Sequence, residues 1–174
     1  MWTLARPLAA ARVPPNAITV AGAVLAVDAA LFADRVPLAA LGLIVASALC
    51  DGLDGAVAVV SGRATRVGAV ADGLADRIAD CAFALAIWRC GAPLWLAATA
   101  GALSLVHELS RTVLGGRLRT TITVAERPTR VICAALAAAS AAVSDASWPP
   151  TVCAAVWAGA ALIGLGRLAR QTTS

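Results

Sequence analysis

The chain has 174 residues, of which 60% are hydrophobic and 14% charged, with a mean hydropathy of +0.84. Soluble domains are nearer half apolar and one-quarter charged, so the composition excludes an ordinary soluble protein and indicates an integral membrane protein. The net charge of +4 comes without any lysine, because all fourteen basic residues are arginine. In so apolar a chain we expect membrane lipids as partners and no nucleic acid.

The first predicted element is an amphipathic helix over residues 2–12, which ends before Pro14-Pro15 and suits the membrane surface. Six apolar runs follow, at residues 17–33, 36–60, 68–89, 92–114, 129–144 and 148–168. A helix needs about 20 residues to cross a bilayer. We therefore predict an all-α fold, an integral membrane bundle of six transmembrane helices behind an N-terminal juxtamembrane helix. The whole chain, residues 1–174, forms one domain in this interpretation.

Arginines are distributed unevenly between the two ends of these predicted helices. One end carries Arg6, Arg12, Arg63, Arg66, Arg117, Arg119, Arg127, Arg167 and Arg170. The other end carries only Arg35 and Arg89. Positive charge stays on the cytoplasmic side, so both termini and the basic loops are predicted to face the cytoplasm from the cell membrane. We interpret Arg63 and Arg66 as solvated turn or lipid-headgroup residues.

Four acids occupy the second and third predicted spans, where carboxylates are costly and indicate function. Asp51 and Asp54 are three residues apart, and Asp72 and Asp76 are four apart, so each pair lies on one helix face. The two spans turn at residues 61–66, and a rise of 1.5 Å per residue brings both pairs to similar depth. For Asp80 we expect either a helix–helix hydrogen bond or an ion pair with Arg77.

Carboxylates that converge in a medium of low dielectric repel one another unless a cation is present. Mg²⁺ and Mn²⁺ prefer oxygen ligands and commonly bridge to substrate phosphates. Gly55 and Gly68 lie beside the acids and leave space for a bulky group. The acids therefore predict a divalent-metal site for a phosphate ester that arrives from the cytoplasm, with a lipid partner from the bilayer.

The order of these residues resembles the signature of the CDP-alcohol phosphotransferase family, D-x2-D-G-x2-A-R-x8-G-x3-D-x3-D. Seven of its eight fixed positions match with the same spacing: Asp51, Asp54, Gly55, Ala58, Gly68, Asp72 and Asp76. The exception is the arginine after Ala58, which is Val59 here. Upstream, Pro15, Asn16 and Thr19 resemble the PNxxT opening of the family's first span.

The resemblance implies transfer of a phosphatidyl-type group from a CDP-lipid, CDP-diacylglycerol, to an alcohol, with release of CMP. It implies two ions, Mg²⁺ or Mn²⁺, held by Asp51, Asp54, Asp72 and Asp76, with Asp76 also the general base. The implied CDP-binding residues are Asn16, Thr19, Asp51, Asp54, Gly55, Ala58, Gly68 and Asp72. A homodimer is a further expectation from the family.

The acceptor is suggested by a second similarity, in the stretch HELSRTVLGGRLRTTITVAERPTRV. It resembles the acceptor region of actinobacterial phosphatidylinositol phosphate synthases, including their AERxxR segment. Arg111, Arg127 and Arg130 would then bind the phosphate of a polyol phosphate such as inositol phosphate. Glycerol 3-phosphate is equally anionic and stays open as the acceptor.

Three other classes of protein share some of these sequence features. An ion or proton transporter would use the intramembrane acids as a relay, but it does not explain the fixed offsets of the glycines. Aromatic prenyltransferases of the membrane also bind metals through aspartates, but they are longer and carry acid motifs in two helical pairs. A non-catalytic scaffold is favoured only by Val59.

Overall fold

The computed structural model describes residues 2–63, 65–113 and 127–172. These form α-helices without a strand: α1 (Trp2–Ala10), α2 (Pro15–Phe32), α3 (Pro37–Val60), α4 (Arg66–Arg89), α5 (Leu94–Val113), α6 (Arg127–Val143) and α7 (Trp148–Thr172). The all-α prediction is confirmed, and each of the six apolar runs corresponds to one of the helices α2 to α7. Within these described ranges, three helical segments are long and apolar enough to cross a membrane: Pro15–Phe32, Pro37–Val60 and Trp148–Arg170.

Local sequence explains where these helices begin and end. Pro15 and Pro37 open α2 and α3, positions where the missing N–H of proline costs nothing. Thr65 caps α4, because its hydroxyl oxygen accepts a hydrogen bond from the Gly68 backbone N–H at 3.0 Å. Local sequence thus defines the end of α3 and the start of α4, and α2 packs against both of these acid-bearing helices.

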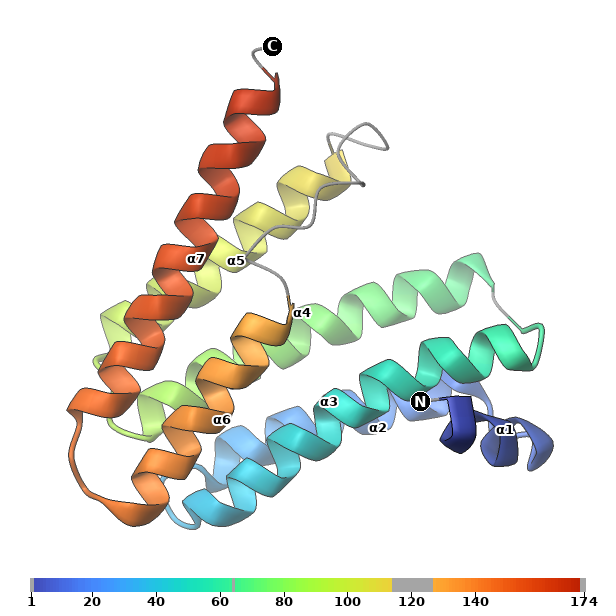
Figure 1. Ribbon diagram of the computed structural model, residues 1–174, viewed down its shortest axis with the longest axis horizontal. Coiled ribbons are helices and arrows are strands. Elements are labelled where there is room, and N and C mark those ends of the chain that lie inside the picture. The colour runs from blue at the N-terminus through green and yellow to red at the C-terminus, as the bar shows by residue number, and fades with distance from the viewer. Residues whose placement is uncertain (1, 64, 114–126, 173–174) are drawn as a thin grey trace.

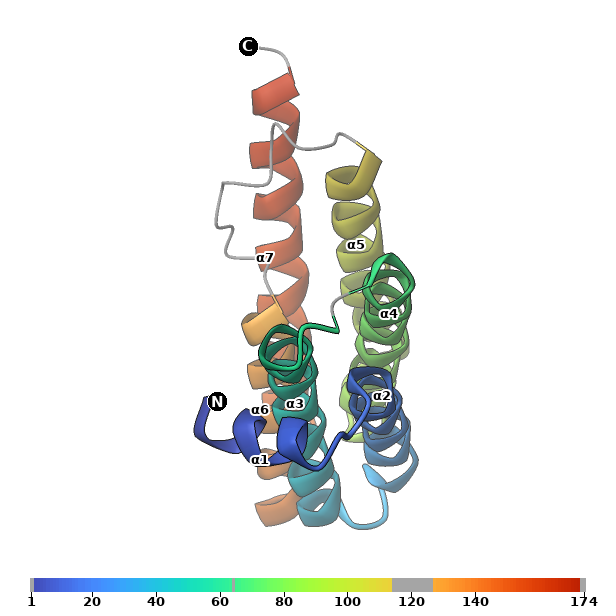
Figure 2. The same ribbon diagram turned by 90° about the vertical axis from the view of Figure 1, so that its right-hand side faces the viewer.

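Helices α2, α3 and α4 run side by side, and α6 packs against α3, α4 and α7 (Figure 1). Helices α5 and α7 pack against each other and run at an angle to α2, α3 and α4 (Figure 1). Helix α1 lies across the bundle beside α3 (Figure 2). The start of α6 lies next to the middle of α4, which brings Arg127 to the acids.

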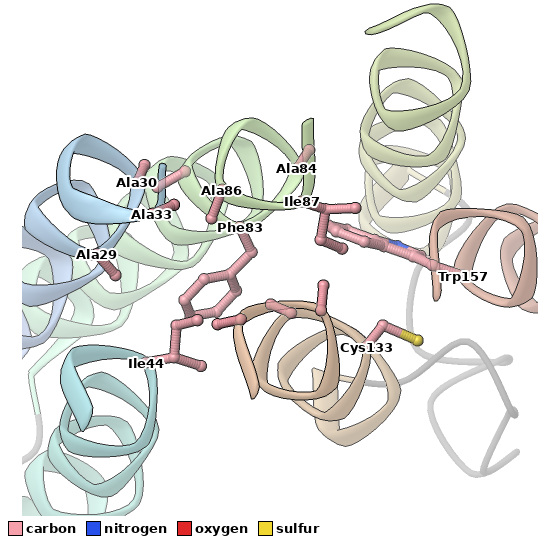
Figure 3. Close-up of a cluster of buried hydrophobic side chains, with 14 of the residues drawn as sticks. Ala29, Ala30, Ala33, Ile44, Phe83, Ala84, Ala86, Ile87, Cys133 and Trp157 are labelled. Carbon is pink, nitrogen blue, oxygen red and sulfur yellow. The ribbon is translucent and has the colours of Figure 1, made fainter. Parts of the chain in front are cut away.

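Large side chains from three helices meet at the centre of the bundle (Figure 3). Phe83 and Ile87 of α4 lie between Ile44 of α3 and Trp157 of α7, and all four are at most 1% exposed. Alanines fill much of the rest of this core, so the helix backbones approach closely. The indole N–H of Trp157 donates to Ser104 Oγ at 2.6 Å, which satisfies its one polar atom.

Close helix packing also depends on glycine at particular positions. A methyl group on Gly101 would lie 3.2 Å from Ala84 Cβ of α4. A methyl group on Gly22 of α2 would lie 3.0 Å from Cys50 Cβ of α3. At Gly42 a methyl group would have nothing within 4 Å, so that glycine is not at a tight contact.

At the end of the bundle opposite the α3–α4 turn, a surface ion pair joins two connections. The Arg89 guanidinium donates to Asp34 Oδ1 from Nη2 at 2.7 Å and from Nε at 3.1 Å. This hydrogen-bonded guanidinium lowers the pKa of the Asp34 carboxyl below its usual value.

Candidate active site

Four aspartates from two helices converge next to the α3–α4 turn. One carboxylate oxygen from each of Asp51, Asp72 and Asp76 lies within 4.8 Å of the other two. Asp54 joins them in the lining of one small cavity. The acids therefore point toward one another between α3 and α4, as their helical spacing predicts.

Asp54 is the most buried of the four, at 5% exposure, and its carboxylate is held from two sides. The Thr19 hydroxyl donates to Asp54 Oδ2 at 2.6 Å, and the Gly55 backbone N–H donates to Oδ1 at 2.6 Å. The first of these bonds ties α2 to α3. The orientation of this acid is thus set by the helix that opens with Pro15-Asn16.

An arginine at the start of α6 also contacts the acids. The Arg127 guanidinium forms ion pairs with Asp51 and with Asp76. We had placed Arg127 in a loop, and the structure makes it the first residue of α6. A guanidinium therefore contacts the acid cluster directly. This contact could not be predicted from the sequence, in which Arg127 lies far from both acids.

One turn later, Arg130 is buried and forms an ion pair with Asp80 of α4. Its Nη2 also lies 3.6 Å from Glu108 Oε2 of α5. Of our two expectations for Asp80, the contact between helices is confirmed. Arg77 instead donates to the Gly73 backbone oxygen at 2.5 Å.

A cavity of about 250 Å³ opens beside the acids, between the first turns of α2 and the α3–α4 turn. It is lined by Pro15, Asn16, Thr19, Asp54, Gly55, Ala58, Val59, Arg63, Thr65, Gly68, Ala69 and Asp72. These include every predicted CDP-binding residue except Asp51, which lines the neighbouring small cavity. A methyl group on Gly68 would lie 3.2 Å from Asn16 Oδ1, so this glycine lets α4 approach the start of α2.

A second cavity, of about 320 Å³, lies on the other side of Asp76. It is lined by Asp76, Glu108, Arg111, Arg127, Pro128 and Arg130. All three predicted acceptor-binding arginines thus meet at one cavity, although they come from two helices. Arg117 and Arg119 lie outside the described residues.

The sequence does not predict Arg63, Thr65 and Ala69 at the first cavity, and the structure places all three in its lining. The interpretation of Arg63 as a solvated turn residue is incomplete for this reason. Arg63 lies beyond the end of α3, so helical spacing gave no signal for its position.

The acid cluster fits a hard divalent cation. Its ligand atoms are all carboxylate oxygens from three side chains, close enough to share one ion, and no thiol or imidazole is among them. Such a donor set suits Mg²⁺ or Mn²⁺ and not the softer metals. Asp76 belongs both to this cluster and to the arginine-lined cavity.

The carboxylate cluster lies between a cavity with glycines and hydroxyls and a cavity with arginines. This arrangement suits an enzyme that transfers a phosphate-linked group with the help of a hard metal ion. The chain belongs to the CDP-alcohol phosphatidyltransferase family, whose model matches residues 12–168. It is therefore an enzyme of phospholipid biosynthesis, and the resemblance found in the signature is confirmed. Membership also favours the enzyme over the transporter and the scaffold.

Solved structures agree with this assignment. The chain is 27% identical to Mycobacterium tuberculosis phosphatidylinositol phosphate synthase (PgsA1), crystallised with CDP-DAG bound, with a TM-score of 0.72. That match covers 99% of this chain and 91% of the other. A structure of PgsA1 with manganese and citrate gives 25% identity and a TM-score of 0.72, covering 98% of this chain and 86% of the other. No curated protein sequence matches the chain significantly.

Proposed function

We propose that this enzyme transfers a phosphatidyl group from CDP-diacylglycerol to a polyol phosphate, inositol phosphate being the first candidate, and releases CMP. The observation that carries the proposal is the position of Asp76, which belongs to the acid cluster and also lines the arginine-rich cavity. A group transferred at the acids would therefore meet its acceptor at this residue.

The donor would occupy the 250 Å³ cavity, with Asn16, Thr19, Asp54, Gly55, Ala58, Gly68 and Asp72 as its lining and Asp51 next to it. Support comes from the match to PgsA1 with CDP-DAG bound, which shares 27% of its sequence with this chain. The small residues Gly55, Ala58 and Gly68 would allow the nucleotide to lie against the helix backbones.

Asp51, Asp54, Asp72 and Asp76 would hold the metal, for which we propose two ions, Mg²⁺ or Mn²⁺. When bound, such ions neutralise the diphosphate and stabilise the charge on departing CMP. The manganese in the PgsA1 structure supports the choice of a hard divalent cation. Thr19 would keep Asp54 in a fixed orientation through its 2.6 Å hydrogen bond.

Asp76 would act as the general base. The acceptor hydroxyl oxygen attacks the phosphorus that carries the diacylglycerol, and the bond from that phosphorus to the CMP oxygen breaks. CMP leaves with the electron pair, and the hydroxyl proton passes to the Asp76 carboxylate. Arg127, in contact with Asp76, would orient this base.

The acceptor phosphate would be bound by Arg111, Arg127 and Arg130, which line the second cavity. Guanidinium groups suit phosphate because they donate two parallel hydrogen bonds. Asp80 and Glu108 hold Arg130 in its buried position, so the basic wall of this cavity is preorganised.

For the cellular arrangement, we propose six membrane-spanning helices, α2 to α7, in the cell membrane. The acid cluster and both termini would face the cytoplasm, because the arginine-rich connections gather at that end. A homodimer is part of this proposal on the basis of the family.

One assay tests the proposal. Purified enzyme with CDP-diacylglycerol and Mn²⁺ is given inositol, inositol 3-phosphate, glycerol and glycerol 3-phosphate in turn, and CMP release is measured. We expect release with inositol phosphate and little with the unphosphorylated polyols. Release with glycerol 3-phosphate alone would identify that acceptor instead, and release with unphosphorylated polyols would contradict the role of the arginines.

A further inference from the structure

Arg63 lines the 250 Å³ cavity next to Val59, and both follow the acid pair of α3. Among the described residues that line this cavity, Arg63 is the one with a cationic side chain. Val59 occupies the position where the family signature has arginine, and its side chain is 64% exposed at the cavity. The cavity therefore receives its positive charge one turn later than the signature predicts.

The backbone fixes Arg63 in this place. Gly62 follows the last turn of α3 with a φ of +65°, a left-handed conformation that glycine adopts without strain. The Gly62 N–H donates to the Val59 carbonyl oxygen at 3.3 Å, and the Arg63 N–H donates to the Ala58 carbonyl oxygen at 3.0 Å. These two bonds are those of a Schellman motif, which reverses the chain at a helix end. The motif turns residue 63 back over the face of α3 that carries Val59.

The negative charge at this cavity favours a cationic side chain in its lining. Asp54 and Asp72 line it with carboxylates, while Asn16, Thr19 and Thr65 contribute neutral polar groups. A diphosphate adds further negative charge, and a guanidinium binds phosphate oxygens through paired hydrogen bonds. Arg63 lines this cavity and can supply that contact, whereas Arg127 and Arg130 line the second cavity.

We propose that Arg63 is a donor-binding residue whose guanidinium binds the diphosphate of the CDP-lipid, in place of an arginine at position 59. The proposal rests on the proposed function only in taking a CDP-linked lipid as the donor. It adds a contact that the family signature does not contain, and it gives a reason why Val59 is compatible with activity.

Binding measurements test this contact apart from catalysis. Affinities of CDP, CMP and cytidine for the purified protein with Mn²⁺ are compared between wild type, Arg63→Ala and Arg63→Lys. We expect Arg63→Ala to weaken CDP about tenfold or more while cytidine changes less than about twofold. Arg63→Lys should be intermediate, because lysine keeps the charge without the paired geometry. An equal loss for CDP and cytidine would overturn the proposal.

Arg66→Ala is the matched control. This substitution removes the same charge close to the same turn, but Arg66 does not line the cavity. It should leave the CDP affinity within about twofold. A loss as large as that of Arg63→Ala would mean that general basic charge near the membrane surface is responsible, and would overturn the proposal.

The double variant Val59→Arg with Arg63→Ala tests the exchange of positions. We expect CDP affinity to return to within about threefold of wild type, because the new guanidinium enters the same cavity. If the double variant still bound cytidine but its CDP affinity did not recover, the equivalence of positions 59 and 63 would be overturned. If wild type binds CDP but releases no CMP with any acceptor, the proposed function fails, and the CDP-to-cytidine comparison still decides the role of Arg63.

Discussion

The hydroxyl of Thr19 donates a 2.6 Å hydrogen bond to Asp54 across the contact between α2 and α3. Both residues are buried and line the cavity next to the acids. The opening of the first long helix thereby controls the orientation of an acid on the next one.

Replacing Thr19 by valine keeps the shape of the side chain but removes this donor. Hydrogen bonds to charged groups contribute about 1.5–3 kcal/mol, so we expect the apparent affinity for Mn²⁺ or for the CDP-lipid to fall about tenfold or more. Thr19→Ser is the control and should stay near wild type. Metal-dependent activity measured over a Mn²⁺ titration checks this, and a Thr19→Val titration that overlays wild type would contradict it.

Asp76→Asn removes the proposed base while keeping the size of the side chain. General-base catalysis typically contributes 10²–10⁴-fold, so we expect CMP release to fall at least about a hundredfold at saturating Mn²⁺. Asp28→Asn, an acid of α2 outside both cavities, serves as the matched control. Full CMP release by Asp76→Asn would show that another group accepts the proton.

The buried pair of Arg130 and Asp80 joins α6 to α4. Arg130→Leu leaves a buried carboxylate without its partner, and loss of one partner of such a pair typically costs about 3–5 kcal/mol. We expect a clear drop in thermal stability in detergent, and recovery of most of it in the double variant with Asp80→Leu. If the double variant were as unstable as the single one, the loss would come from packing and not from the unpaired charge.

Two glycines provide a test of helix packing between α2 and α3. In Gly22→Ala the new methyl group would lie 3.0 Å from Cys50 Cβ, so Cys50 must shift to admit it. Overpacking of this kind typically costs about 1–3 kcal/mol. Gly42→Ala meets nothing within 4 Å and should be neutral or slightly stabilising. Unfolding in detergent–SDS mixtures ranks the two variants, and the reverse order would contradict the packing.

The ion pair of Asp34 and Arg89 predicts a pH effect with a definite sign. The pKa of Asp34 is lowered below its usual 3.8, so the pair stabilises the fold above that value. That contribution is lost as the pH falls through the lowered pKa of the folded protein. The stability difference between wild type and Asp34→Asn should therefore be present at pH 6 and shrink below about pH 4. A difference that grew on acidification would show that the pair does not hold in solution.

Much of the site could be predicted from the sequence because it depends on local spacing. The intervals between Asp51 and Asp54 and between Asp72 and Asp76 place each pair on one helix face whatever the surroundings. The short turn between α3 and α4 then leaves the two faces few ways to meet. The grouping of Asn16, Thr19 and Gly68 was implied by the family resemblance and not by spacing, and the structure places all three at one cavity.

What the sequence by itself determined is the set of helices and the convergence of the acids on one hairpin, because both follow from periodicity and from distances of a few turns. Only the tertiary structure decided which arginine contacts which acid and that Arg63 joins the cavity. Arg127 lies 76 residues from Asp51, and Arg130 lies 50 from Asp80. Such pairs depend on how α6 packs against α3 and α4. That packing is set by the shapes of side chains such as Phe83 and Ile44, and shape complementarity has no periodic pattern in the sequence.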